Sequence, residues 1–258
     1  MLYPVRTLRG CLQDKGFACR AAQMHWPWIN PSGMPRIIFI TGTDTGVGKT
    51  LLTGLLLQHL RRAGRHALAM KPFCSGGRGD ARLLHELQGR ELSLGEVNPF
   101  YFEAPLAPLP AARMQHVTIT LEQVLERISR VANRCECLLV EGVGGILVPL
   151  GEGYTVADLI AKLRCEVVLV SANRLGTLNH TILTARVLQD IGISRLKVAL
   201  MAQMQPDPSC ESNGILLAES LDRIKIVAIH FLGANACRVG ALKRAQKKVE
   251  KSLAEILA

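Results

Sequence analysis

Short apolar runs alternate with amphipathic stretches along most of the chain. The runs contain almost no polar residues, which is typical of parallel strands covered on both faces. They predict strands at residues 37–41, 67–71, 137–141, 167–171, 198–201 and 224–229. Between them, apolar residues at helical spacing predict helices at residues 49–63, 80–88, 121–133, 155–163, 179–191, 210–221 and 241–257. This alternation indicates an α/β fold, a doubly wound and mostly parallel sheet in a single domain.

Residues 1–34 differ from the rest of the chain. They hold both tryptophans, Trp26 and Trp28, and show no clear period. They lack the continuous apolar core of a secretory signal, and the presence of Asp14 with few serines argues against organelle targeting. We therefore expect residues 1–34 to be a dispensable or disordered N-terminal extension, and residues 35–258 to form the domain.

The formal net charge of +10 raises the question of a nucleic-acid partner. The densest basic run, residues 243–248, alternates with apolar residues at helical spacing, which favours the solvated face of a C-terminal helix. Aromatic residues make up 4% of the chain, too few for a base-stacking surface. No apolar stretch reaches the roughly 18 residues of a membrane span. We expect a cytoplasmic protein that binds neither nucleic acid nor membrane.

The chain has eight cysteines, and among them Cys135 and Cys137 are closely spaced. One intervening residue differs from the CxxC spacing of many zinc and redox sites. Buried, reduced thiols are therefore the expectation for most of the cysteines.

The segment GTDTGVGKT follows the first predicted strand and precedes a predicted helix. It is one residue longer than GxxxxGK[ST], the phosphate-binding loop of P-loop NTPases, because five residues separate Gly42 from Gly48, but it lies in the required context between a strand and a helix. In such a loop, backbone N–H groups and the start of the helix bind phosphates. Lys49 would bridge the β and γ phosphates of ATP, and the Thr50 hydroxyl would bind Mg²⁺. The predicted nucleotide-binding residues of this loop are Gly42, Thr43, Asp44, Thr45, Gly46, Val47, Gly48, Lys49 and Thr50.

Other readings of this loop are less favoured. A glycine-rich turn without a ligand would not require a strand and a helix on its two sides. Asp44 stands where ATPases that position chromosomes or division sites carry a lysine that reaches a partner's nucleotide. The chain also has no Asn-Lys-x-Asp tetrapeptide, which argues against a GTPase switch.

Three charged residues lie beside other predicted strands. Lys71 closes the second strand, Asp80 starts the next helix, and Glu141 closes the strand 137–141. Ligands of open α/β sheets bind at the carboxyl ends of strands, so Lys71 is placed to neutralise a transferred phosphoryl group. Asp80 and Glu141 supply the carboxylates that Mg²⁺ prefers. The alternatives are a solvated strand end for Lys71 and an ordinary helix cap for Asp80.

Several motifs, taken in order and spacing, resemble the dethiobiotin synthetase family. They are GTDTGVGKT, Lys71-Pro-x-x-Ser75-Gly76, Asp80, Asn98-Pro99, Pro105-x-x-Pro108, Val140-Glu-Gly-Val-Gly-Gly145 and Leu175-Gly176-x-x-Asn179-His180. The resemblance covers residues 36–232. It implies an ATP-dependent carbon-nitrogen ligase, a cyclo-ligase of biotin biosynthesis. From 7,8-diaminopelargonic acid and CO₂ (or bicarbonate), such an enzyme forms a carbamate, phosphorylates it with ATP and closes the ureido ring of dethiobiotin.

The resemblance also implies roles for individual residues. Thr45, Lys49 and Lys71 would be catalytic, close to the phosphates and the carbamate. Mg²⁺ would be held by Thr50, Asp80 and Glu141. The family is a homodimer in which the substrate carboxylate rests on the start of a helix of the neighbouring subunit. The substrate-binding residues would be Thr45, Lys71, Ser75, Gly144, Gly176, Thr177, Leu178 and Asn179. A plain helix cap is the alternative for Asn179.

The chain departs from the family pattern where the base of the nucleotide is expected. Ala202-Gln203-Met204 replaces an Asn-Asp pair whose amide reads adenine, and Gln203 is the predicted substitute. His230 and Leu109 replace a proline and a histidine of the pattern. These changes concern base selectivity more than phosphate chemistry.

Two other functions are compatible with a P-loop. The first is another P-loop amide ligase, such as a cobyrinate synthase relative, although 258 residues leave little room for its glutaminase domain. The second is a non-catalytic, nucleotide-binding interaction protein, which loss of Lys71, Asp80 or Glu141 would have favoured. All three residues are present.

Overall fold

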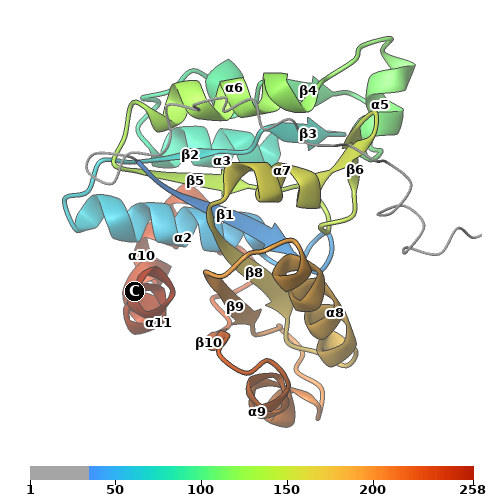
Figure 1. Cartoon of the computed structure of the whole chain (residues 1–258). Coiled ribbons are helices and arrows are strands. Elements are labelled where there is room, and N and C mark those ends of the chain that lie inside the picture. The colour runs from blue at the N-terminus through green and yellow to red at the C-terminus, as the bar shows by residue number, and fades with distance from the viewer. Residues whose placement is uncertain (1–34) are drawn as a thin grey trace, which may run out of the picture. The chain divides into compact units, whose positions relative to one another are not determined.

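The structure is a computed structural model that describes residues 35–258. A six-stranded sheet with the order β10-β9-β8-β1-β5-β2 forms its centre, and every neighbouring pair in it is parallel (Figure 1). The strands are β1 (Arg36–Gly42), β2 (Ala67–Met70), β5 (Cys137–Glu141), β8 (Glu166–Ala172), β9 (Leu196–Met201) and β10 (Lys225–Ile229). Their carboxyl ends therefore share one edge of the sheet.

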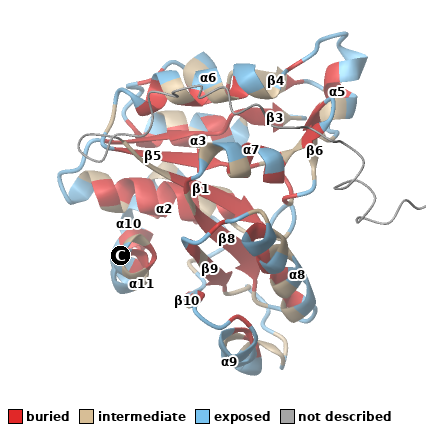
Figure 2. Cartoon of the chain, viewed as in Figure 1, coloured by how far each residue is buried: buried red, intermediate tan, exposed pale blue. Residues whose placement is uncertain are grey.

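Helices cover both faces of this sheet. The first layer consists of α2 (Lys49–Arg62), α3 (Gly79–Leu87), α10 (Val239–Ala245), the 3₁₀ turn η1 (Gln246–Val249) and α11 (Glu250–Leu257). The second consists of α6 (Leu121–Ala132), α7 (Val156–Leu163), α8 (Thr177–Asp190) and α9 (Cys210–Ser220). Figure 2 shows the central strands and the inner side of α2 as buried. The predicted doubly wound α/β fold is confirmed.

Short elements complete the fold at the edge beside β2. Two parallel strands, β3 (Phe73–Ser75) and β4 (Phe100–Phe102), form a small sheet. The others are α4 (Leu94–Val97), α5 (Pro108–Met114) and the antiparallel strands β6 (Pro149–Gly151) and β7 (Tyr154–Thr155). The apolar pattern did not predict these elements, because runs of two to seven residues show no period.

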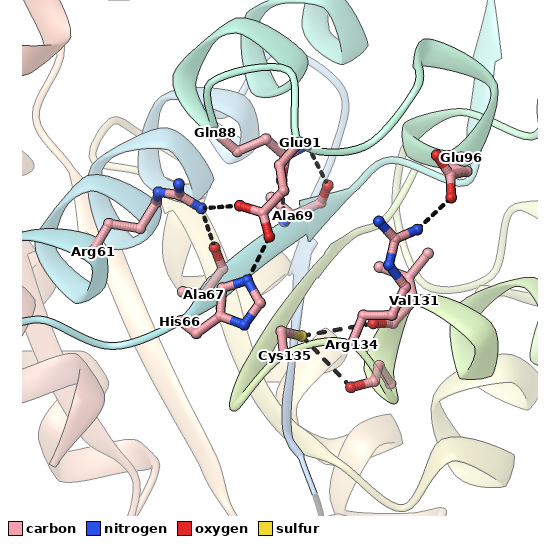
Figure 3. Close-up of polar contacts among 11 residues, drawn as sticks. Arg61, His66, Ala67, Ala69, Gln88, Glu91, Glu96, Val131, Arg134 and Cys135 are labelled. Carbon is pink, nitrogen blue, oxygen red and sulfur yellow. Dashed lines mark hydrogen bonds and ion pairs between the residues drawn. The ribbon is translucent and has the colours of Figure 1, made fainter.

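A polar cluster fixes the amino end of β2. Arg61 donates to the carbonyl of Ala67 at 2.9 Å and to Glu91 at 3.1 Å. His66 forms a second hydrogen bond to Glu91 (Figure 3). These contacts hold the start of a strand whose other end leads to Lys71.

The predicted C-terminal helix 241–257 is interrupted. Its predicted apolar positions are buried and its basic residues are exposed, so the amphipathic pattern is confirmed. The chain nevertheless forms α10, η1 and α11 in place of one helix. At the interruption, the buried side chain of Gln246 bonds to Arg62 and His59 of α2. The helical spacing of apolar residues does not predict such contacts between side chains that are far apart in the sequence.

None of the helices within residues 35–258 is long and apolar enough to cross a membrane. The six cysteines in this part of the chain are free. The predictions made for residues 1–34 lie outside the described residues.

Candidate active site

The loop between β1 and α2 has the backbone geometry of a phosphate cradle. A Cβ atom on Gly42 would lie 2.8 Å from Val47 Cγ2 and 3.1 Å from the carbonyl oxygen of Asp44, so glycine is required where the loop folds back. Gly48 adopts a left-handed conformation with φ of 104° and caps α2. Because α2 begins at Lys49, its free N–H groups and positive end face the loop. The loop therefore forms an anion-binding site to which the start of α2 contributes N–H groups and its positive end.

Lys49 joins this loop to the segment that follows β5. Its ammonium donates to the carbonyl oxygens of Asp44 at 2.6 Å and Gly144 at 3.0 Å. The side chain is buried, and burial together with the positive charge of Lys71 lowers the pKa of Lys49 to about 8. A phosphate beside Lys49 would supply the negative charge that this position lacks.

Lys71, Glu141 and Asp80 form one ionic cluster at the carboxyl ends of β2 and β5. Lys71 Nζ lies 2.5 Å from Glu141 Oε1 and 2.8 Å from Asp80 Oδ2. Thr50 donates its hydroxyl to the same Glu141 oxygen at 2.7 Å. Burial alone lowers the pKa of Lys71, but the two carboxylates outweigh it and raise this pKa above its ordinary value. Lys71 is therefore a charged, buried ammonium.

The structure corrects the alternatives considered for these residues. Lys71 is 7% exposed, so it is not a solvated strand end. It also lies outside β2, which ends at Met70, one residue earlier than predicted. Asp80 is the second residue of α3, whose cap is Arg78, so Asp80 is not a helix cap. Its carboxylate pairs with Lys71 instead.

The acidic part of the cluster fits a magnesium ion that is bound together with phosphate. Glu141 Oε2 is buried and has no hydrogen-bond partner among residues 35–258, which is costly unless a ligand completes it. Within residues 35–258, no three or more His, Cys, Asp or Glu side chains are grouped for metal binding. Mg²⁺ needs only one or two carboxylates from the protein, because water molecules and phosphate oxygens fill the rest of its coordination shell. Thr50, Asp80 and Glu141 would supply the protein's ligands.

Thr45 and Gly144 lie close together beside Lys49, whereas Ser75 lies in the short strand β3. A Cβ atom on Gly144 would meet Val148 at 2.7 Å and lie 3.8 Å from Thr45 Oγ1, so this glycine packs closely beside the loop. Ser75 is the last residue of β3, partly exposed, four residues after Lys71. Along the chain, Gly144 follows the carboxyl end of β5 and Ser75 follows that of β2, on the side where ligands of such sheets bind.

The start of α8 is exposed on one side and buried on the other. The helix begins at Thr177 and is capped by Gly176, so the reading of Asn179 as a cap is wrong. Thr177 points inward, and its hydroxyl lies 2.6 Å from that of Ser171 in β8. Gly176 and Asn179 are exposed, and Leu178 is partly exposed. Thr177 N donates to the Arg174 carbonyl oxygen at 3.1 Å, so among these residues Leu178 and Asn179 are the ones whose N–H groups could reach a ligand from outside the subunit.

A small cavity of about 10 Å³ lies between the phosphate-binding loop and the start of α8. Arg174 and His180 line it together with Asp44 and the buried hydroxyls. Arg174 was not predicted as a site residue, because a charged residue in a loop carries no periodic or motif signal. The cavity extends the site from the loop toward α8.

Gln203 follows β9, on the side of the loop opposite to Lys71. The side chain of Met201 packs against Gly48, since a Cβ there would lie 3.2 Å from Met201 Cε. Gln203 turns back and donates its amide to the Met201 carbonyl at 2.8 Å. Its carbonyl oxygen remains able to accept a hydrogen bond from a base amino group.

These features define the class of the protein: a P-loop nucleotide-binding protein with a doubly wound parallel sheet. Two solved structures share the fold. The ParA family ATPase from Chlorobium tepidum TLS is 16% identical with a TM-score of 0.55, covering 87% of this chain and 98% of that chain. A chain of the MinC:MinD cell division protein complex of Aquifex aeolicus is 14% identical with a TM-score of 0.51, covering 84% and 96%. At these identities the likeness concerns the fold alone.

Sequence relatives identify the family. A protein-family model described as an AAA domain matches residues 36–232. The ATP-dependent dethiobiotin synthetase of Bacillus subtilis (strain 168) is 34% identical over 223 residues, covering 84% of this chain and 96% of that protein. The synthetase of Anaeromyxobacter dehalogenans (strain 2CP-C) is 40% identical over 212 residues, covering 80% and 95%. The chain belongs to the dethiobiotin synthetase family, and the resemblance found in its motifs is confirmed.

Proposed function

We propose that the protein is an ATP-dependent dethiobiotin synthetase. It converts 7,8-diaminopelargonate, CO₂ and ATP into dethiobiotin, ADP and phosphate, in the cytoplasm. Family membership supports the overall reaction and the use of ATP. The observation that carries the proposal for the site is that Lys49, Thr50, Lys71, Glu141 and Asp80 converge at one end of the phosphate-binding loop.

Binding and charge neutralisation are the main tasks of this site. The loop N–H groups and Lys49 bind the β and γ phosphates. Mg²⁺, held by Thr50, Asp80 and Glu141, would neutralise phosphate charge. Lys71, the residue that follows β2, would stabilise negative charge on the carbamate and on the transferred phosphoryl group.

The reaction then needs little further chemistry from the protein. One substrate amine adds to CO₂ and loses a proton, which gives a carbamate. A carbamate oxygen attacks the γ phosphorus, and ADP leaves. The second amine attacks the carbamate carbon and loses a proton, the bond to the phosphate oxygen breaks with release of phosphate, and the ureido ring closes. Holding these groups in contact supplies most of the rate enhancement, because intramolecular geometry replaces collisions.

Substrate binding is proposed to involve both subunits of a homodimer. Ser75, Thr45 and Gly144 would contact the substrate beside its reacting groups. The helix start formed by Gly176, Thr177, Leu178 and Asn179 would receive the carboxylate of the substrate bound to the other subunit, through the N–H groups of Leu178 and Asn179. Leu175, 81% exposed at the same helix start, is a large apolar side chain that a partner subunit would cover. Gln203 would accept a hydrogen bond from the adenine amino group.

A product assay tests the proposal. The protein is incubated with Mg-ATP, bicarbonate and 7,8-diaminopelargonate, and dethiobiotin is measured by mass spectrometry together with ADP. We expect one ADP for each dethiobiotin, and no product from Lys49→Ala. Lys247→Ala, which removes an exposed lysine of η1, is the control and should match the unaltered protein. ATP hydrolysis without dethiobiotin would contradict the proposal.

A further inference from the structure

Asn98 is a buried side chain that holds the backbone around Lys71. It follows α4 and is 0% exposed. Its amide nitrogen lies within hydrogen-bonding distance of three carbonyl oxygens, those of Lys71 at 3.0 Å, Pro72 at 3.1 Å and Phe100 at 3.2 Å. Two backbone bonds join the same segments: Lys71 N donates to Val97 O at 2.9 Å, and Phe100 N to Pro72 O at 3.0 Å. These hydrogen bonds to residues 97–100 fix the backbone of the turn at which Lys71 leaves the sheet.

Arg78 extends this clamp to the segment that carries Asp80. Its Nε donates to Asn98 Oδ1 at 3.0 Å, and its Nη2 lies 3.4 Å from the Asn98 carbonyl oxygen. The guanidinium also lies over the ring of Tyr101, 4.5 Å from its centre. Arg78 is the residue before α3, two positions ahead of Asp80. One amide thus connects the backbone of Lys71 to the helix start that supplies its carboxylate partner.

The position of β2 explains why such a clamp is needed. In the part of the chain that the structure describes, β2 is an edge strand and its pairing with β5 ends at Met70, so the Lys71 carbonyl lies beyond the strand pairing. A catalytic group has to be held to within about 0.5 Å by contacts that fix its backbone and its rotamer. Glu141 and Asp80 hold the ammonium of Lys71, whereas its backbone depends on the segment 97–100.

We propose that Asn98 and Arg78 are positioning residues that place the Lys71 ammonium between Glu141 and Asp80, facing the phosphate-binding loop. The inference rests on the proposed function insofar as Lys71 contacts the transferred phosphoryl group. It adds that the catalytic lysine is held in register by a buried amide and an arginine that do not themselves touch the reacting atoms.

Gln88 provides a matched control. It is also a 0% exposed amide at the free edge of β2, where its oxygen accepts from Ala69 N at 2.9 Å and its nitrogen donates to Ala69 O at 3.3 Å (Figure 3). Ala69 lies two residues before Lys71 and is not part of the site. Replacing Gln88 therefore removes hydrogen bonds to β2 but leaves the contacts that hold the turn at Lys71. Arg82, exposed on α3, is the matching control for Arg78.

The experiment compares Asn98→Ala with Gln88→Ala, and Arg78→Lys with Arg82→Lys, in the full chain. Thermal unfolding, kcat, and the KM for ATP are measured. Independently of turnover, the rate at which an amine-acylating reagent labels Lys71 is followed by peptide mass spectrometry. For Asn98→Ala we expect kcat to fall by roughly tenfold to a hundredfold, as for a small misplacement of a catalytic group. Lys71 should be labelled faster, and the KM for ATP should change little.

Gln88→Ala should lose comparable stability but keep both kcat and the slow labelling of Lys71. Equal losses of kcat in Asn98→Ala and Gln88→Ala, or unchanged labelling of Lys71, would overturn the inference. If Asn98→Ala does not fold, the comparison of Arg78→Lys with Arg82→Lys tests the inference. Arg78→Lys should lower kcat and speed the labelling of Lys71. Equal kcat and labelling rates in the two arginine variants would overturn the inference. Absence of dethiobiotin from the unaltered protein would refute the proposed function alone, because the labelling rates still report on positioning.

Discussion

Replacing Lys71 by methionine should destabilise the protein as well as inactivate it. The ammonium lies 2.5 Å from Glu141, whose side chain is 0% exposed. Breaking a buried pair by removing one partner costs about 3–5 kcal/mol, because the remaining charge is left without compensation. Asp80 adds little to this cost, since its side chain is 50% exposed and water can replace the lost partner.

The size of the effect can be measured by urea and thermal unfolding. For chains of 150–250 residues, about 1 kcal/mol corresponds to 2–4 °C, so Lys71→Met should lower Tm by roughly 6–20 °C. The double variant Lys71→Met, Glu141→Gln removes both charges and should recover most of this stability. Both variants should form no dethiobiotin.

A double variant no more stable than Lys71→Met would refute this reasoning, as would a loss below about 1 kcal/mol in the single variant, the upper range for surface ion pairs. In either case Glu141 would not be the charge that Lys71 compensates. The unaltered protein and the single variant Glu141→Gln complete the double-mutant cycle.

Three further predictions concern other parts of the chain. A Cβ atom on Gly54 of α2 would lie 2.7 Å from Leu242 of α10. Gly54→Val should therefore lower the free energy of unfolding by about 2–3 kcal/mol through overpacking. An unchanged urea unfolding curve would contradict this contact. Gln203→Ala should raise the KM for ATP by roughly three- to tenfold, the value of one hydrogen bond, and leave kcat nearly unchanged. An unchanged KM would remove Gln203 from the base site. A chain without residues 1–33 should keep its synthetase activity, because every candidate site residue follows them; loss of activity would contradict the prediction of a dispensable extension.

The central strands were predictable because their burial on both faces leaves continuous apolar runs. The phosphate-binding loop was predictable for a different reason, since its glycines and Lys49 act through local backbone geometry. The short strands β3 and β4 were missed, because three residues carry no period and their pairing joins segments about 27 positions apart. The break at η1 was missed because Gln246 is a polar residue buried by contacts with a helix far away in sequence.

In the candidate site, too, some features were predictable from the sequence and others required the structure. The rule that parallel strands share their carboxyl edge predicted that Lys71 and Glu141 would lie near the loop. Their direct ion pair, and its extension to Asp80, required the structure. The role of Asn98 depends on carbonyl groups of distant residues, and side-chain identities do not reveal such contacts.

The proposed arrangement of ligands can be seen in a crystal structure with Mg²⁺, a non-hydrolysable ATP analogue and 7,8-diaminopelargonate. We expect the γ phosphate against Lys49 and Lys71, the metal on Thr50, Asp80 and Glu141, and a substrate amine facing the γ phosphate. A triphosphate bound away from this loop, or a diamine outside the cluster, would contradict this arrangement.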